Sequence, residues 1–216
     1  MLAHRQWADA RASVLAALED GCRWVAVVGP PGVGKTMLVR DIARTLASDS
    51  GKDIRNATPT AKHTMLIVAA GPNGTALLDD ADGLSETMLA GLSAPAGPRC
   101  VFAGSPDLAG RVRAVVAETR IVVLDRLPPT EARAYLALWL DRENLSAKFF
   151  EPQATAELIA AAQGVPRSLS KLAHRAVQIA ASEDARRVGA AHVREAISPP
   201  ADMPAPQPDE AARAYP

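Results

Sequence analysis

The sequence predicts a parallel α/β sheet that is followed by a small all-helical subdomain. Short apolar, β-branched runs alternate with helical patterns as far as residue 124, and strands stop from Pro128 onward. A glycine-rich turn, GPPGVGKT, joins the first apolar run to the helical pattern after it. Alternating strands and helices are typical of a parallel sheet whose crossovers are helices. The chain has 216 residues and is 48% apolar, which is enough to bury a core of this kind.

The elements of the sheet region follow from their periodicity. Leu2, Trp7, Val14 and Leu18 repeat at helical spacing, and Gly21 can end that helix. The run CRWVAVVG is short, apolar and β-branched, as a buried strand is. By the same criteria the region contains helices at 2–19, 35–47, 85–91 and 107–118 and strands at 22–29, 75–79, 99–104 and 120–124.

The segment between residues 52 and 70 gives the weakest local signals. TMLIVAA, at 64–70, has the composition of a strand, but only GPNG separates it from the strand that follows. A parallel crossover needs about a dozen residues. We therefore expect a helix from Pro59 to Ala70, with Thr58 as its N-cap and a poor strand candidate at 52–57 before it.

The last third of the chain is predicted to be helical. Helical patterns run at about 130–142, 152–163, 167–182 and 189–197. We therefore expect an α/β domain over residues 1–126 and a helical lid, as we name it here, over residues 127–197. The tail at 198–216, SPPADMPAPQPDEAARAYP, is rich in proline and has no apolar period, so we expect it to be disordered.

Composition excludes several classes of protein. Lysine plus arginine equals aspartate plus glutamate, 24 each, so net charge gives no argument for a nucleic-acid or acidic-membrane partner. The two cysteines, Cys22 and Cys100, lie beside apolar runs and are expected to be buried, reduced thiols. No apolar run approaches the length that spans a bilayer, and the N-terminus lacks an apolar signal core. We expect a cytoplasmic protein with no membrane partner.

GPPGVGKT matches the phosphate-binding pattern G-x-x-x-x-G-K-[ST], the P-loop, between an apolar strand and an amphipathic helix. Positive φ at Gly29, Gly32 and Gly34 would let backbone N–H groups point at phosphates. Lys35 would reach the β- and γ-phosphates of ATP, and the Thr36 hydroxyl would ligate Mg²⁺. A chance glycine-rich turn is the alternative. The expected nucleotide-binding residues are Gly29, Pro30, Pro31, Gly32, Val33, Gly34, Lys35, Thr36 and Met37.

TALLDDAD, at 75–82, supplies a pair of acids at the end of an apolar strand. Asp79 would hold Mg²⁺, directly or through water, and Asp80 would orient the attacking water. The alternative is a solvated acidic turn. In ATP-hydrolysing motors the second acid is usually glutamate, so Asp80 is one methylene short, and a misplacement of that size can cost about 10²-fold in rate.

Taken in order, GPPGVGKT, LLDDAD, VFAGSPDLAGRV, TRIVVLDRLPP and GVPRSLSKLAHRA resemble an AAA+ ATPase. The pattern is similar to the ATPase module of general secretion pathway protein A and to transposition-helper and origin-recognition ATPases. GSPDL at 104–108 and GVPR at 164–167 narrow the resemblance. It covers residues 5 to 197 and implies a P-loop parallel sheet with a helical lid, Mg-ATP as ligand, and a homo-oligomer when ATP is bound.

The resemblance implies roles for three further residues. Ser105 matches the first sensor position, which hydrogen-bonds the attacking water or the γ-phosphate; the alternative is a strand-to-helix cap. Arg120 matches the arginine that reaches a neighbouring subunit's nucleotide, with a surface arginine as the alternative and Arg113 as a rival. Arg167 matches the second sensor, which would touch the γ-phosphate from the lid.

Two other functions stay open from the sequence. The doublet of Asp79 and Asp80 is also usual in STAND-type signalling NTPases, which predicts a nucleotide-gated switch or adaptor with negligible hydrolysis. Basic side chains in the lid predict either a DNA-binding face or a solvated helical face; they are Arg167, Lys171, Arg175, Arg186, Arg187 and Arg194. A protein partner is expected under the first two functions, and the sequence does not identify it.

Overall fold

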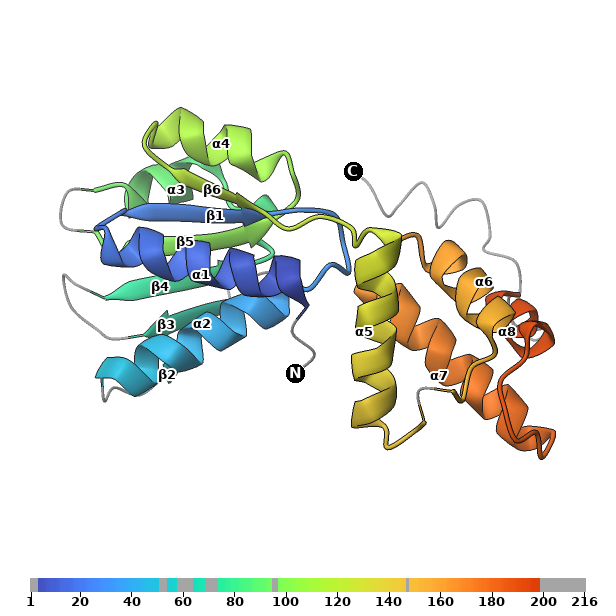
Figure 1. The fold of residues 1–216 in the computed structure, drawn as a ribbon. Helices are drawn as coiled ribbons and strands as arrows, with labels where there is room; N and C mark the ends of the chain where they lie inside the picture. Colours follow the sequence, from blue (N-terminus) through green and yellow to red (C-terminus); the bar gives the residue numbers. More distant parts are fainter. Residues whose placement is uncertain are drawn as a thin grey trace.

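The computed structural model describes residues 4–50, 54–57, 64–68, 74–94, 97–146 and 148–198. A six-stranded sheet with its helices lies beside a bundle of four helices, and the chain after the sixth strand joins them (Figure 1). The strands have the order β2-β3-β4-β5-β1-β6. Their bounds are β1 Trp24–Val28, β2 Ile54–Ala57, β3 Thr64–Val68, β4 Thr75–Asp79, β5 Arg99–Gly104 and β6 Arg120–Val123.

Four strands, β4, β5, β1 and β6, are parallel, as the sequence predicts. Every residue of β1 and β4 is buried, because helices cover both faces of the sheet. The predicted α/β P-loop sheet with a helical lid is therefore confirmed. Parallel strands end at the same edge of a sheet, so the segments that follow β1, β4 and β5 meet there.

The two faces of the sheet bury alternate residues of the same strands. Val25 and Val27 pack under α1 (Arg5–Glu19) and α2 (Lys35–Ser50). Trp24 and Phe102 pack on the other face, with a ring-centroid separation of 4.8 Å, near η1 (Ala81–Gly83), α3 (Glu86–Leu92) and α4 (Leu108–Val115). The period of two along each strand thus divides the core into two layers.

The expected helix at Pro59–Ala70 is wrong for its described part. Residues 64–68 form β3, which runs antiparallel to β4 with Thr64 opposite Asp79 and Val68 opposite Thr75. The short GPNG connection cannot hold a parallel crossover, but an antiparallel pair needs only a hairpin. The strand expected at 52–57 exists as β2, antiparallel to β3. Thr58 and the remainder of the expected helix lie outside the described residues.

The helical lid has its own apolar core. Its helices are α5 (Pro129–Arg142), α6 (Pro152–Ala162), α7 (Pro166–Ser182) and α8 (Ala190–Ile197). The cluster that they bury begins at Leu127, whereas the cluster under the sheet ends at Leu124. Only a short linker therefore separates the two cores. The tail after Ser198 lies outside the described residues.

Both cysteines are free thiols, as expected. Cys100 is buried, and desolvation raises the pKa of its thiol to about 12. Cys22 is half-buried rather than buried. Within the described ranges, none of the helices is both long and apolar enough to cross a bilayer.

Candidate functional site

A cavity of about 450 Å³ lies where the parallel strands end and the lid begins. Its walls come from the P-loop, the turn after β4, the end of β5, and the helices α5 and α7. The lining residues are Gly29, Pro31, Gly32, Gly34, Lys35, Thr36, Met37, Asp80, Asp82, Ser105, Tyr135, Pro166 and Arg167. Most of the expected site residues therefore meet at one place.

The glycines of the P-loop have different structural roles. Gly32 and Gly34 adopt positive φ, +84° and +110°, as expected. Gly29 does not adopt positive φ, so that expectation is wrong. Gly29 is needed for close packing instead, because a Cβ there would lie 1.9 Å from the Leu124 carbonyl oxygen. The first glycine therefore lets the chain leaving β6 pass directly against the loop.

Lys35, the first residue of α2, bonds to its own loop in this conformation. Its Nζ donates to the Gly29 carbonyl at 2.7 Å and to the Pro30 carbonyl at 2.9 Å. Burial lowers the pKa of the Lys35 ammonium, and the carboxylates of Asp82, Asp79 and Asp80 oppose that shift. The positive charge of Arg167 adds to the lowering. The ammonium thus lies among three carboxylates and one guanidinium.

The two expected acids end in different environments. Asp79 is the last residue of β4 and is buried, 7% exposed. Asp80 is exposed, lines the cavity, and adopts the left-handed conformation with φ 53° and ψ 41°. Asp and Asn visit this region more readily than other residues with a side chain. The left-handed backbone conformation therefore favours aspartate at position 80, and the sequence pattern does not reveal this preference.

Asp82, the third acid of LLDDAD, was missed by the sequence reasoning. Its Oδ1 and Oδ2 accept from the Ser105 N–H at 3.0 and 2.9 Å, and Oδ1 accepts from the Ser105 hydroxyl at 2.6 Å. A Cβ at Gly104 would lie 2.7 Å from Asp82 Oδ2, so only glycine admits this approach. The one signal that the sequence offers is its place as the third acid of that run.

The turn that carries Asp82 is fixed from the other side by Arg111 of α4. One guanidinium nitrogen donates to the Asp82 carbonyl at 2.5 Å, and the other donates to the Leu84 carbonyl. Ser105 is not the N-cap of α4, because Asp107 occupies that position. The Ser105 carbonyl accepts from the Leu108 N–H at 3.2 Å at the start of α4, while its own N–H and hydroxyl are directed to Asp82.

The lid reaches the cavity through the start of α7. Pro166 is the first residue of that helix, as the GVPR pattern predicts, and the Arg167 N–H donates to the Gly32 carbonyl at 3.2 Å. A Cβ at Gly32 would lie 2.8 Å from Val165 Cγ1. The exposed Arg167 side chain lines the cavity. The lid arginine is thus attached to the P-loop through its own backbone.

The linker between the sheet and the lid is held by the turn that precedes α7. The Leu127 N–H donates to the Gly164 carbonyl at 2.7 Å, and Arg126 donates to the Gln163 side chain at 3.2 Å. Gly164 has φ +73°, and a Cβ there would lie 2.3 Å from the Leu127 carbonyl oxygen. The end of the linker is therefore attached to the lid at Arg126 and Leu127.

A smaller cavity of about 140 Å³ adjoins the first and shares Gly34, Met37, Tyr135 and Pro166 with it. Its other walls are His4, Trp7, Val33 and Arg142. Burial lowers the pKa of His4, and the Glu131 carboxylate opposes that shift. The cavity is mostly apolar and is bounded by α1 on one side and by α5 on the other.

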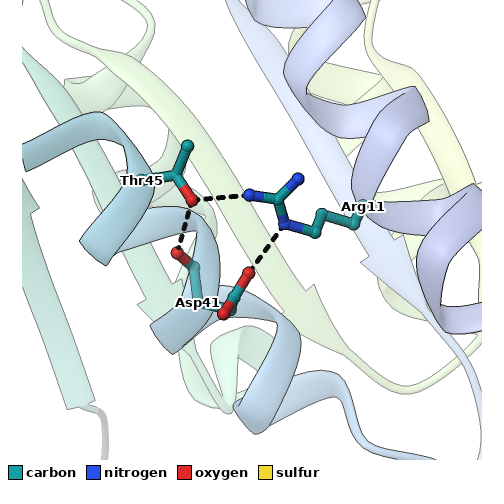
Figure 2. Close-up of polar contacts among 3 residues, drawn as sticks. All are labelled: Arg11, Asp41 and Thr45. Atoms are coloured by element: carbon teal, nitrogen blue, oxygen red, sulfur yellow. Dashed lines mark hydrogen bonds and ion pairs between the residues drawn. The ribbon is translucent and has the colours of Figure 1, made fainter. Parts of the chain in front are cut away.

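A polar network holds α1 in place against α2. Arg11 donates from Nε to Asp41 Oδ2 and from a terminal nitrogen to Thr45 Oγ1, both at 2.7 Å (Figure 2). The Thr45 hydroxyl donates in turn to the Asp41 carbonyl at 3.1 Å (Figure 2). The same helix carries Trp7, so this network positions one wall of the smaller cavity.

Arg120 lies away from both cavities. It is the exposed first residue of β6 and pairs with Val25, at the opposite end of β1 from the P-loop. It lines a separate groove of about 290 Å³ beside α1. Arg113 is exposed in the last turn of α4. Neither arginine is brought to this chain's own site.

Residues 25–91 match the family model described as ATPase family associated with various cellular activities (AAA). No curated protein sequence matches the chain. Among solved structures, a variant of RuvB from Thermotoga maritima is similar, with a TM-score of 0.63 and 18% identity. That match covers 88% of this chain and 66% of the other, so this chain spans about two thirds of the length of that protein.

A second similar structure is described as the Thermotoga maritima RuvB Holliday junction branch migration motor. It has a TM-score of 0.61 and 16% identity, and the match covers 89% of this chain and 67% of the other. At these identities the likeness shows the fold alone. The specific resemblance to secretion and transposition ATPases gains no support from either comparison. Residues 25–91, which contain the P-loop and Asp79, are therefore similar to the AAA family model, and the chain has a P-loop fold similar to that of RuvB.

Proposed function

We propose that this chain is a Mg-ATP-dependent ATPase whose helical lid converts nucleotide turnover into a conformational change of a partner. The observation that supports it most directly is the cavity itself. The P-loop lysine, the acid that follows β4, and an arginine from the lid line one space of about 450 Å³. A glycine-rich turn formed by chance would not assemble these groups from segments more than a hundred residues apart.

Lys35 would bind the phosphates, and Thr36 and Asp79 would bind Mg²⁺. Lys35 would exchange its two carbonyl partners for oxygens of the β- and γ-phosphates. These charged oxygens are stronger hydrogen-bond acceptors than neutral carbonyls. Thr36 and Asp79 offer the oxygen ligands that Mg²⁺ prefers, and the described residues contain no cluster of three metal-binding side chains. The metal would therefore be held jointly with the phosphates, whose developing charge it would neutralise.

Asp80 would act from the sheet side of the cavity, and Arg167 would act from the lid side. The Asp80 carboxylate lines the cavity and would accept a hydrogen bond from the attacking water. Arg167 would bind a γ-phosphate oxygen and so draw the lid toward the P-loop. The base of the nucleotide would lie in the smaller apolar cavity between Trp7 and Tyr135, which is continuous with the larger one through four shared residues.

The position of Arg120 fits an action on another subunit. It is exposed on an edge strand, at the far end of the sheet from its own P-loop. Under the proposal, the ATP-bound chain forms a homo-oligomer in which Arg120 supplies positive charge to the neighbour's transition state. Arg113 remains the rival for that role.

A nucleotide-gated switch with negligible hydrolysis is the second candidate, and Asp80 supports it. The shorter carboxylate stands on a left-handed backbone, so its reach toward a water differs from that of a glutamate on an ordinary strand end. A switch predicts tight ATP binding, slow turnover, and partner binding that depends on the nucleotide.

DNA is a further candidate partner, because one similar structure is described as a branch migration motor. Two of the basic lid side chains have partners within the chain. Arg194 pairs with Glu157 at 3.3 Å, and Arg187 Nε donates to the Lys148 carbonyl at 3.0 Å. This favours a solvated helical face over a DNA-binding face. Salt-dependent binding of DNA would support the DNA-linked role, and its absence at low salt would remove it.

The deciding experiment is steady-state ATP hydrolysis across a range of protein concentrations, with Lys35→Ala as the blank. Turnover well above the blank, with specific activity that climbs with concentration, is the expected result. Turnover equal to the blank, together with tight binding of ATP to the wild type, would reject the ATPase and support the switch.

A further inference from the structure

Asp82 has no role in the site as proposed above, yet it makes the densest set of side-chain hydrogen bonds there. Both of its oxygens accept from the Ser105 N–H, and Oδ1 also accepts from the Ser105 hydroxyl at 2.6 Å. Asp82 and Ser105 both line the larger cavity. The pair joins the turn after β4 to the end of β5, and those strands are neighbours in the sheet.

The hydroxyl of serine has one proton to donate and two lone pairs that can accept. In this structure the proton is directed to Asp82, in a short bond of the charge-assisted kind. Toward the cavity, Ser105 therefore presents lone pairs only. Oxygens of a γ-phosphate are acceptors, so Ser105 cannot bind them without giving up Asp82. A water molecule has protons to donate, so Ser105 can accept one of its hydrogen bonds.

We propose that Asp82 is a positioning residue that makes Ser105 an acceptor for the attacking water rather than a donor to the γ-phosphate. The inference rests on the proposed ATPase function and refines it, since the first-sensor position could act on either group. Under the proposal two oxygens orient the water, the Asp80 carboxylate and the Ser105 hydroxyl. The second one compensates for the short reach of Asp80.

The surroundings hold Asp82 firmly enough for this task. Arg111 donates to the Asp82 and Leu84 carbonyls, which fixes the turn from outside the cavity. Gly104 leaves room for the carboxylate, because a Cβ there would collide with both Asp82 and Leu108. A carboxylate held by its backbone and by a neighbouring strand defines the direction of the Ser105 proton.

The test compares two nucleotide analogues that differ in what they imitate. ADP with beryllium fluoride imitates the γ-phosphate of bound ATP, whereas ADP with aluminium fluoride imitates the transition state, in which the attacking water is also held. Affinity for each is measured on the wild type, Asp82→Ala, Asp82→Asn, Ser105→Ala and the Asp82→Ala/Ser105→Ala double variant. Asp107→Asn is the matched control, because Asp107 is an exposed neighbour whose side chain makes no cap hydrogen bond.

We expect Asp82→Ala and Ser105→Ala to weaken the aluminium fluoride complex by about 10-fold, the upper end of the range for one neutral hydrogen bond. The beryllium fluoride complex should change by less than about 3-fold, and the double variant should lose no more than either single variant. Asp82→Asn, which keeps one acceptor oxygen, should fall between the wild type and Asp82→Ala. Melting temperatures identify any variant that fails to fold, and Ser105→Ala and Asp82→Asn then carry the comparison.

Equal weakening of both complexes would mean that Ser105 binds the γ-phosphate, and the proposal would be wrong. If neither complex is weakened, Asp82 has a structural role alone, and the proposal is again wrong. Independent losses that multiply in the double variant would break the link between the two residues. A wild type that binds neither complex better than Lys35→Ala would remove the proposed function itself, and this inference with it.

Discussion

The two walls of the larger cavity are built in different ways. The sheet wall carries Lys35, Asp80 and Ser105 on segments that leave β1, β4 and β5, and the pairing of those strands fixes their positions. The lid wall carries Tyr135 and Arg167 on helices with a separate apolar core. The sheet wall is therefore held by hydrogen bonds between paired strands, whereas the lid wall belongs to a separate helical subdomain.

The junction between the walls consists of a few contacts. The Arg167 N–H donates to the Gly32 carbonyl, and the His4 ring lies edge-on to the Tyr135 ring of α5 with centroids 6.0 Å apart. Breaking these contacts costs far less than separating buried strands. The comparison suggests that the sheet wall fixes the geometry of the chemistry, while the lid wall responds to the occupant. Variants on the two sides should therefore fail in different ways.

Lys35→Ala should have the largest effect, because it removes the cation of the sheet wall. Hydrolysis should fall to the level of a protein-free control, and affinity for a fluorescent ATP analogue should fall by about 10- to 100-fold. Lys171→Ala, on the exposed part of α7, is the control and should bind ATP as the wild type does. Retention of ATP affinity by Lys35→Ala would contradict a role for the Lys35 ammonium in binding the phosphates.

Arg120→Ala tests whether a neighbouring subunit adds a third wall. Hydrolysis should fall by about 10³-fold, the range for an arginine supplied in trans. ATP binding by the isolated chain should not change, because Arg120 lies away from both cavities.

Mixing Arg120→Ala with Lys35→Ala makes this test specific. One variant keeps the site and the other keeps the arginine, so the mixture should regain part of the activity that each lacks. Arg113→Ala is measured in parallel as the rival. A mixture no more active than its components would argue against an action in trans.

Asp80→Asn should slow single-turnover hydrolysis by about 10²-fold while leaving ATP affinity nearly unchanged. Asparagine keeps the size of the side chain and tolerates the left-handed backbone, so the fold should persist. Asp80→Glu restores the longer acid but strains the backbone by about 1 kcal/mol. A gain in hydrolysis by Asp80→Glu would show that reach, rather than backbone conformation, limits the native enzyme.

Arg167→Ala tests the lid wall. ATP affinity should fall by about 10-fold, and ADP affinity should change less, because only ATP offers a γ-phosphate to the guanidinium. The backbone bond from residue 167 to Gly32 survives the substitution, so the lid should stay attached. Arg175→Ala, farther along the same helix, is the control. Equal losses for ATP and ADP, measured by calorimetry, would contradict a role in sensing the γ-phosphate.

Arg11→Met should have the smallest effect and should act on stability. The Arg11–Asp41 pair is half-buried, and its loss should cost about 1 kcal/mol, which lowers Tm by about 2–4 °C. Arg5→Met is the matched control, because the Arg5–Asp9 pair on the same helix is exposed and 3.8 Å long. Thermal unfolding of both variants checks the difference. Equal shifts would mean that the network in Figure 2 does not position α1.

Sequence by itself determined the elements whose signals are local. The P-loop, the buried strand before it, and the helix start at Pro166 each follow from residue types at fixed spacing. Four parallel strands are predicted by apolar runs that alternate with helical patterns, and the helical lid is predicted by the helical patterns that follow them. Lys35 and Asp80 could be chosen as candidates from the phosphate-binding pattern and the acidic strand end, whereas Ser105 and Arg167 were chosen through the family resemblance.

Tertiary structure alone decided which of those candidates meet and what they face. The antiparallel β3, the tight approach of Leu124 to Gly29, and the direction of the Ser105 proton depend on segments far apart in the chain. A local pattern cannot report a contact between residues 82 and 105, because the pairing of β4 with β5 brings them together. Sequence therefore supplied the chemical groups of the site, and the sheet and its junction with the lid arranged them.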